Sequence, residues 1–129
     1  MENSEIQGLN NSKGIYICIF KLDFEQDINV GKMGLHFFKK GFYLYVGSAF
    51  GGGGLKARIL RHSEKSTKIH WHIDYLKSLS SFVGCYIKLT DLTEEHKTAS
   101  HLSELFEIPV KGFGSSDCKC STHLFYQSY

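Results

Sequence analysis

The stretch Gly14-Ile15-Tyr16-Ile17-Cys18-Ile19-Phe20 is apolar on both faces and rich in β-branched residues. This pattern is typical of a strand buried in the middle of a sheet. A second run with the same character, Phe42-Tyr43-Leu44-Tyr45-Val46, ends at Gly47-Ser48. Because strand side chains alternate between faces, two neighbouring strands can present Tyr16 and Tyr45 on one side of a sheet. The two runs therefore predict core strands that carry a pair of phenols.

The rest of the chain predicts an α+β domain. A hairpin is expected at 23–34, where Ile28 and Val30 alternate with polar residues and glycines supply turns. Apolar periodicity predicts helices at 55–63, 69–79 and 90–106, and strands at 82–89 and 123–126. We expect a small, mainly antiparallel central sheet flanked by helices, with an inserted hairpin and a C-terminal strand. Residues 1–13 are expected to be a flexible N-terminal segment and residues 14–129 a single domain.

Composition excludes several classes of protein. Apolar residues make up 42% of the 129-residue chain and charged residues 22%, which is ordinary for a globular domain. No apolar run approaches the ~20 residues that a membrane span needs, so no membrane association is expected. The first dozen residues are polar and lack an apolar signal core. The sequence therefore predicts a cytoplasmic protein.

Basic side chains cluster in one segment although the net charge is only +2. A local basic stripe can bind phosphates even in a nearly neutral chain. The alternative is a solvated helix face. The stripe consists of Lys56, Arg58, Arg61, His62, Lys65 and Lys68.

Two of these residues, Arg58 and His62, are four positions apart and share a face of the expected helix. Arginine matches phosphate oxygens and stays charged, whereas histidine titrates near neutrality and can share a proton. The preceding loop, Gly51-Gly52-Gly53-Gly54, leads into a helix N-terminus that attracts anions. A flexible hinge is the alternative interpretation of this loop.

Glu94 and Glu95 open the third expected helix. Acids in a first turn compensate the helix dipole, which is one interpretation. The other is a metal carboxylate, because Mg²⁺ binds through one or two carboxylates plus water and substrate phosphate.

Cys118-Lys119-Cys120 and His123 place three soft ligands within six residues. This spacing invites structural zinc, but the sequence offers no obvious fourth ligand. We favour buried or weakly packed thiols over zinc at this cluster.

In combination, these motifs resemble the GIY-YIG nuclease superfamily, and most of all its small single-domain archaeal and bacterial branch. The resemblance spans about residues 14–126. It rests on Gly14-Ile15-Tyr16, Val30-Gly31-Lys32, Gly34, Tyr43-Leu44-Tyr45-Val46-Gly47-Ser48-Ala49, Gly53-Gly54-Leu55-Lys56-Ala57-Arg58-Ile59, Arg61-His62, His70-Trp71-His72-Ile73-Asp74-Tyr75-Leu76, Gly112-Phe113-Gly114-Ser115-Ser116-Asp117-Cys118-Lys119-Cys120 and His123-Leu124-Phe125.

The resemblance implies a three-stranded sheet core and one active site for one-metal phosphodiester cleavage. The implied catalytic residues are the paired motif tyrosines, the helix arginine, the histidine one turn later and the metal-binding glutamate, for which register favours Glu95 over Glu94. In this chain they are Tyr16, Tyr45, Arg58, His62 and Glu95. Substrate contacts are expected at Lys32, Gly47, Ser48, Gly54, Lys56, Arg61 and His72.

Two features depart from the family pattern. The gap between the motif tyrosines is longer than in most of the superfamily, although this branch carries a hairpin insertion there. The chain also has His96 and Thr98 where the branch has Cys and Leu after its glutamate.

The sequence thus predicts an endonuclease that uses Mg²⁺ or Mn²⁺ bound to Glu95 and acts on nucleic acid, DNA rather than RNA, as a monomer or homodimer. The alternative is an inactive nucleic-acid- or protein-binding module of the same fold, with or without zinc at Cys118, Cys120 and His123.

Overall fold

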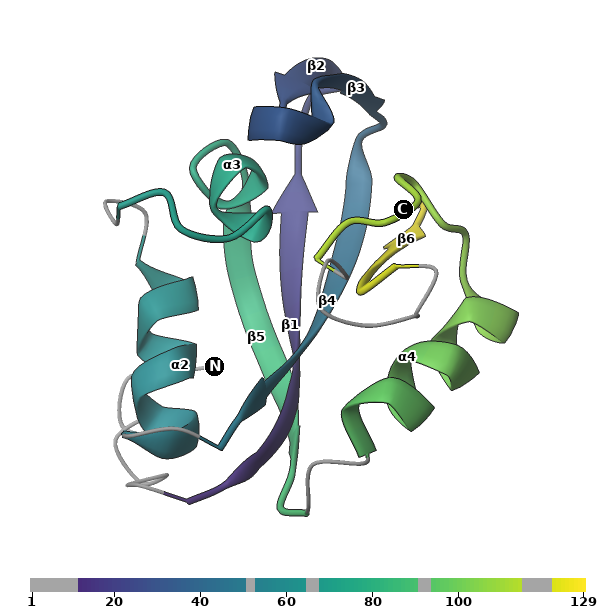
Figure 1. The fold of residues 1–129 in the computed structure, drawn as a ribbon. Coiled ribbons are helices and arrows are strands. Elements are labelled where there is room, and N and C mark those ends of the chain that lie inside the picture. The colour runs from purple at the N-terminus through teal and green to yellow at the C-terminus, as the bar shows by residue number, and fades with distance from the viewer. Residues whose placement is uncertain (1–11, 51–52, 65–67, 91–93, 115–121) are drawn as a thin grey trace.

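The computed structural model describes residues 12–50, 53–64, 68–90, 94–114 and 122–129. Its core is a four-stranded sheet in the order β5-β1-β4-β6, in which every pair of neighbours is antiparallel (Figure 1). The strands are β1 (Gly14–Leu22), β4 (Gly41–Ala49), β5 (Ser81–Lys88) and β6 (Leu124–Gln127). The α+β class is confirmed, and the C-terminal strand widens the expected core from three strands to four. Within the described residues, no helix combines the length and apolar composition needed to cross a lipid bilayer.

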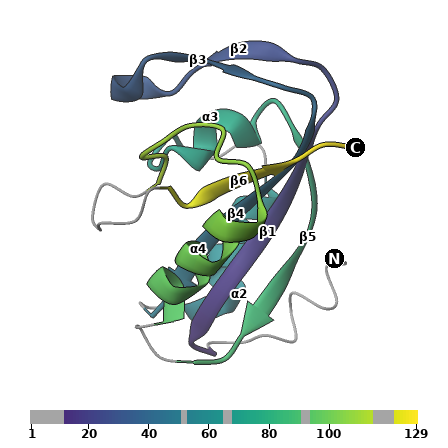
Figure 2. The ribbon, with the colours of Figure 1, turned by 90° about the vertical axis from the view of Figure 1, so that its right-hand side faces the viewer.

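Helices cover both faces of the sheet. Helix α2 (Gly54–Ser63) packs on β1, β4 and β5, whereas α4 (Glu94–Leu105) packs on β4 from the other side (Figure 2). Alternation along β4 explains this division, since Tyr45 joins the apolar cluster beneath α2 and Val46 the cluster beneath α4. The two faces of one strand are therefore committed to different helices.

The insertion between β1 and β4 is a hairpin, as expected, but it extends further along the chain. Strand β2 (Gln26–Asn29) pairs with β3 (Leu35–Phe38), and the short 3₁₀-helix η1 (Gly31–Met33) connects them. Gly31 and Gly34 both adopt positive φ and supply the turns. The prediction that the hairpin ends at Gly34 is wrong, because the return strand begins only after that turn.

Helix α3 (Ile73–Lys77) is much shorter than the expected helix at 69–79. The buried carboxylate of Asp74 accepts the backbone N–H groups of His70 and Trp71, each at 2.8 Å. An acceptor that satisfies the donors of a helix start fixes that start, so residues 68–72 approach α3 as a loop. The apolar spacing of Trp71, Tyr75 and Leu79 therefore places the start of the helix too early in the chain.

Strand β4 is longer than the strand that covers its outer edge. Pairing with β6 stops at Tyr45, and the carbonyl of His123 accepts one more bond from the Val46 N–H at 2.9 Å. Beyond this point, no segment in the described part of the chain pairs with residues 47–49 on that side. Within the described residues, Gly47 and Ser48 therefore lack a strand partner on this side, between the faces that carry α2 and α4.

Candidate active site

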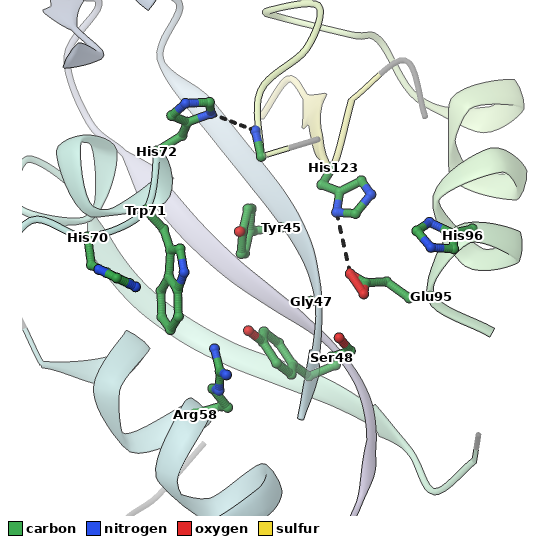
Figure 3. Close-up of a pocket in the computed structure, with 12 residues that line it drawn as sticks. Tyr45, Gly47, Ser48, Arg58, His70, Trp71, His72, Glu95, His96 and His123 are labelled. Carbon is green, nitrogen blue, oxygen red and sulfur yellow. Dashed lines mark hydrogen bonds and ion pairs between the residues drawn. The ribbon is translucent and has the colours of Figure 1, made fainter. Parts of the chain in front are cut away.

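A cavity of about 500 Å³ opens at this end of β4 (Figure 3). Residues from both faces of the sheet line it, because the two faces meet at this end of β4. Among the predicted site residues, those that line the cavity are Tyr16, Tyr45, Gly47, Ser48, Arg58, His72 and Glu95. The fold therefore brings together predicted site residues from β1, β4, α2, α4 and the loop before α3.

His62 lies beneath the two tyrosines and does not line the cavity. Its Nε2 is 2.9 Å from the hydroxyl oxygen of Tyr16, and its ring packs between Tyr16, Tyr45 and Trp71. Burial, reinforced by the positive charge of Lys77, lowers the pKa of His62 to about 3. The imidazole is therefore neutral at physiological pH and supports Tyr16 from behind.

Burial, followed by the neighbouring Tyr45, raises the pKa of Tyr16 well above its ordinary value. Burial also raises the pKa of Tyr45, and the Glu95 carboxylate adds to the shift. Both side chains consequently stay protonated as phenols at neutral pH and can form hydrogen bonds at the cavity wall.

Gly47 makes room for Tyr16. The two residues are paired across β1 and β4, and the phenol of Tyr16 occupies the space that a Cβ at position 47 would fill. A side chain at position 47 would have to displace the ring. The glycine of the second motif thus sets the position of the tyrosine of the first.

Arg58 projects from α2 and lies over the indole of Trp71, 4.7 Å from the ring centroid. Within the described part of the chain, Arg58 has no carboxylate in ion-pair range. Its charge therefore faces a cavity that can take an anion. The indole supplies a flat surface that fixes the guanidinium.

Arg61, a predicted substrate contact, does not line the cavity and instead pairs with a buried carboxylate. It donates two hydrogen bonds of 2.9 Å to the Asp74 carboxylate and lies 4.1 Å from the Trp71 ring centroid. Burial raises the pKa of Asp74, but the bonds from Arg61, Trp71 and His70 outweigh it and lower the pKa to about 2. The fixed pair of Arg61 and Asp74 therefore holds Trp71 beneath Arg58.

His72 accepts a hydrogen bond of 2.8 Å at its Nδ1 from the backbone N–H of Gly114. A backbone N–H can only donate, so Nδ1 is unprotonated and Nε2 carries the proton. Burial lowers the pKa of His72 and favours this neutral form. His72 thus offers an N–H donor at the cavity.

Of the two acids that open α4, only Glu95 lines the cavity. Glu94 forms ion pairs with Lys88 at 3.2 Å and Lys97 at 3.9 Å. Across the cavity wall, Glu95 Oε2 is 3.6 Å from His123 Nδ1. Burial lowers the pKa of His123 and His96 adds to this, although Glu95 acts in the opposite direction.

The donor set at Glu95 is compatible with a divalent cation. Carboxylate oxygen and imidazole nitrogen are both metal ligands. Within the described residues, however, no group of three or more His, Cys, Asp or Glu side chains is arranged to hold a metal. The residues present thus fit an ion that takes few protein ligands and completes its shell with water and phosphate oxygens.

Four predicted substrate-binding residues do not line the cavity. Lys32 is exposed on η1, Gly54 is buried at the start of α2, Lys56 lies further along that helix, and Arg61 is paired with Asp74. The predicted loop residues Gly51 and Gly52, and the cysteines Cys118 and Cys120 of the zinc hypothesis, lie outside the described residues. Of that cluster, His123 is described, and it faces Glu95.

The site prediction lacked five of the residues that line the cavity: His70, Trp71, His96, Gly114 and His123. The run His70-Trp71-His72 is rich in side chains that can bind a ligand. The helix expected at 69–79 includes these residues, whereas in the structure they lie in the loop before α3. His123 was assigned to its cysteine neighbours, because only the fold brings it beside α4.

The chain was compared with protein families, curated proteins and solved structures. The family described as a domain of unknown function, DUF123, matches residues 15–129. No curated protein and no solved structure matches. The family match covers every side chain that lines the cavity.

Proposed function

The chain belongs to the family described as a domain of unknown function, DUF123, and we propose that it is a divalent-metal-dependent endonuclease of the GIY-YIG type that hydrolyses phosphodiester bonds in DNA. The observation that carries the proposal is the convergence of Arg58, Glu95, Tyr16 and Tyr45 on one cavity. They come from opposite faces of the sheet and meet at the end of β4. Packing of an apolar core does not require a cation, a carboxylate and two phenols to line one cavity.

The charge pattern supports a phosphodiester as substrate. Arg58 faces the cavity from one side, and Glu95 lies on the other. A phosphodiester is an anion that needs a cation on its non-bridging oxygens, and it tolerates a carboxylate nearby only when a metal ion screens the two. A neutral or cationic substrate would offer no anionic group for the guanidinium of Arg58 to bind.

In this proposal Arg58 neutralises the charge that grows on the phosphoryl oxygens as water attacks. The N–H at Nε2 of His72 donates a hydrogen bond to a further oxygen of the phosphate. A divalent cation held by Glu95 would supply Lewis-acid polarisation of the phosphate and would stabilise the leaving oxygen.

Tyr16 orients the attacking water instead of removing its proton. Its raised pKa and the low pKa of His62 make proton transfer between them strongly unfavourable. The phenol, held at 2.9 Å by His62, can still accept a proton of the water in a hydrogen bond and direct a lone pair at phosphorus. Tyr45 lines the same wall and completes this hydrogen-bonding surface.

The test is a cleavage assay with purified protein, supercoiled plasmid and Mg²⁺ or Mn²⁺. We expect nicking that EDTA abolishes and that both Arg58→Ala and Glu95→Gln reduce at least about 100-fold, the scale of one transition-state electrostatic contact. Glu94→Gln is the matched control, because Glu94 opens the same helix but pairs with Lys88 outside the cavity.

Two results would contradict the proposal. The first is a folded wild-type protein that cuts neither DNA nor RNA with any divalent ion, which would favour a binding module. The second is a Glu95→Gln variant that cuts as fast as Glu94→Gln, which would remove the carboxylate from the mechanism.

A further inference from the structure

Glu95 and His123 face each other across the wall of the cavity. Glu95 lies in the first turn of α4, and His123 directly precedes β6. The Oε2 atom of Glu95 is 3.6 Å from Nδ1 of His123 (Figure 3). Both side chains are largely shielded from solvent, with 16% and 5% of their side-chain surface exposed.

The backbone of His123 is fixed on both sides. Its N–H donates to the carbonyl of Phe113 at 2.8 Å, and its carbonyl accepts from the N–H of Val46 at 2.9 Å. These bonds fix the point on the main chain from which the imidazole projects beside α4. Such pre-organisation lowers the cost of binding a ligand there.

The distance of 3.6 Å between Glu95 Oε2 and His123 Nδ1 indicates which interaction the two side chains can make. It is longer than a hydrogen bond between nitrogen and oxygen. Two donor atoms that share a small divalent ion at about 2.1 Å each can lie up to about 4.2 Å apart. The two atoms therefore stand at a spacing that suits two ligands of one ion.

We propose that Nδ1 of His123 is a second protein ligand, beside Glu95, of the divalent cation at this site, and that the site consequently prefers a first-row transition ion such as Mn²⁺ or Co²⁺ to Mg²⁺. The inference rests on the proposed function for the role of the ion, but not for its binding. Mg²⁺ prefers oxygen ligands and dehydrates reluctantly, whereas an imidazole nitrogen favours transition ions.

His96 is the nearest competitor for the role. It also lines the cavity, and its ring centroid is 6.2 Å from that of His123. Within the described residues, Glu95, His96 and His123 do not form a three-ligand metal cluster. His123 is the better candidate because its Nδ1 lies 3.6 Å from Glu95 Oε2, and an ion with two protein ligands would have coordination positions left for water and a phosphate oxygen.

The experiment measures ion binding to metal-free protein without any nucleic acid. Mn²⁺ is titrated and followed by its electron paramagnetic resonance signal, and Mg²⁺ is titrated in competition. We expect Mn²⁺ to bind at least about tenfold more tightly than Mg²⁺. We expect His123→Asn to weaken Mn²⁺ binding by about 10- to 100-fold with little effect on Mg²⁺, and Glu95→Gln to weaken both.

Three variants serve as controls. His101→Asn changes an exposed histidine on the same helix outside this cavity and should bind like the wild type. His96→Asn should also retain Mn²⁺ affinity. A Cys118→Ser, Cys120→Ser double variant separates the site from a cysteine-bound zinc and should bind Mn²⁺ normally.

Loss of folding in His123→Asn would not prevent the test. In the wild-type protein, substoichiometric Mn²⁺ should broaden the ring resonances of His123 before those of His101. Unchanged Mn²⁺ affinity in folded His123→Asn, absence of that broadening, or equal affinity for Mg²⁺ would each overturn the inference. DNA cleavage without Mn²⁺ selectivity would leave the nuclease proposal standing, whereas selective binding without cleavage would leave only the metal site.

Discussion

The hydroxyl of Tyr16 and the Nε2 atom of His62 are 2.9 Å apart, although 46 residues separate them in the chain. Both side chains are buried, and the described residues provide no hydrogen-bond partner for the other ring nitrogen of His62. The pKa of the phenol is raised and that of the imidazole is lowered, so the proton on Tyr16 stays where it is. The hydrogen bond therefore holds the Tyr16 side chain in place and does not transfer its proton to His62.

Replacing His62 should reduce the acid sensitivity of folding. The pKa of His62 is about 3 in the folded protein, against about 6.5 in an unfolded chain, so between these values only the unfolded state binds the proton. The contribution of His62 to the free energy of unfolding is therefore fully present above pH 6.5. It falls by up to about 1.4 kcal/mol per pH unit as the pH drops towards 3.

Urea denaturation of the wild type and His62→Gln at pH 7.5, 6.5, 5.5 and 4.5 measures this difference. His72 and His123 also have lowered pKa values and contribute with the same sign, so the variant should lose less stability than the wild type without becoming insensitive. Parallel curves for the two proteins would show that His62 ionises equally in both states.

Removing the indole beneath Arg58 should slow DNA cleavage by the protein that remains folded. Trp71→Leu leaves the guanidinium without its aromatic surface, a contact worth about 0.5–2 kcal/mol, which corresponds to about 2- to 30-fold in kcat/KM. Trp71→Phe keeps a ring and should lie between the two. If Trp71→Phe and Trp71→Leu slowed plasmid nicking equally at matched thermal stability, the aromatic surface of Trp71 would not contribute to the function of Arg58.

Asp74→Asn should destabilise the whole domain. The Asp74 side chain is fully buried and accepts bonds from Arg61, His70 and Trp71, with Lys77 3.5 Å away. Removing one partner of a buried charge network costs about 3–5 kcal/mol, which urea denaturation can measure. Asp27→Asn, an exposed acid on the hairpin, should change stability by less than about 0.5 kcal/mol. If both variants unfolded at the same urea concentration, the network would carry no stability.

Gly47→Ala should displace Tyr16 from His62. The new methyl group would overlap the phenol, and such overpacking costs about 1–3 kcal/mol. Tyrosine fluorescence and plasmid nicking should both change in this variant. Ser48→Ala is the neighbouring control, and it should leave stability unchanged because it adds no atoms. A stable, fully active Gly47→Ala protein would mean that the ring has another place to go.

The sequence predicted most of the sheet, because buried strands need continuous apolar runs such as residues 15–20 and 42–46. It overestimated α3, since apolar spacing cannot reveal that Asp74 accepts the N–H groups that a longer helix would use. The limit there is a long-range buried network, which local periodicity does not record.

The site was predictable where chemistry and motif agree, as at Tyr16, Tyr45, Arg58 and Glu95. It was not predictable where partners come from distant segments. Arg61 belongs to a basic stripe in the sequence, yet Asp74 holds it. His123 adjoins a cysteine pair in the sequence, yet in space it faces Glu95.

In the described part of the chain, the end of β4 has no strand partner on its outer side, which has a consequence for self-association. Residues 47–49 present the outward backbone groups of a strand end, and such an edge can pair with a strand from another chain. The same edge borders the cavity that contains Arg58 and Glu95. If the protein acts on a phosphodiester as proposed, a phosphate in the cavity and a second copy docked by strand addition at residues 47–49 would compete for one place.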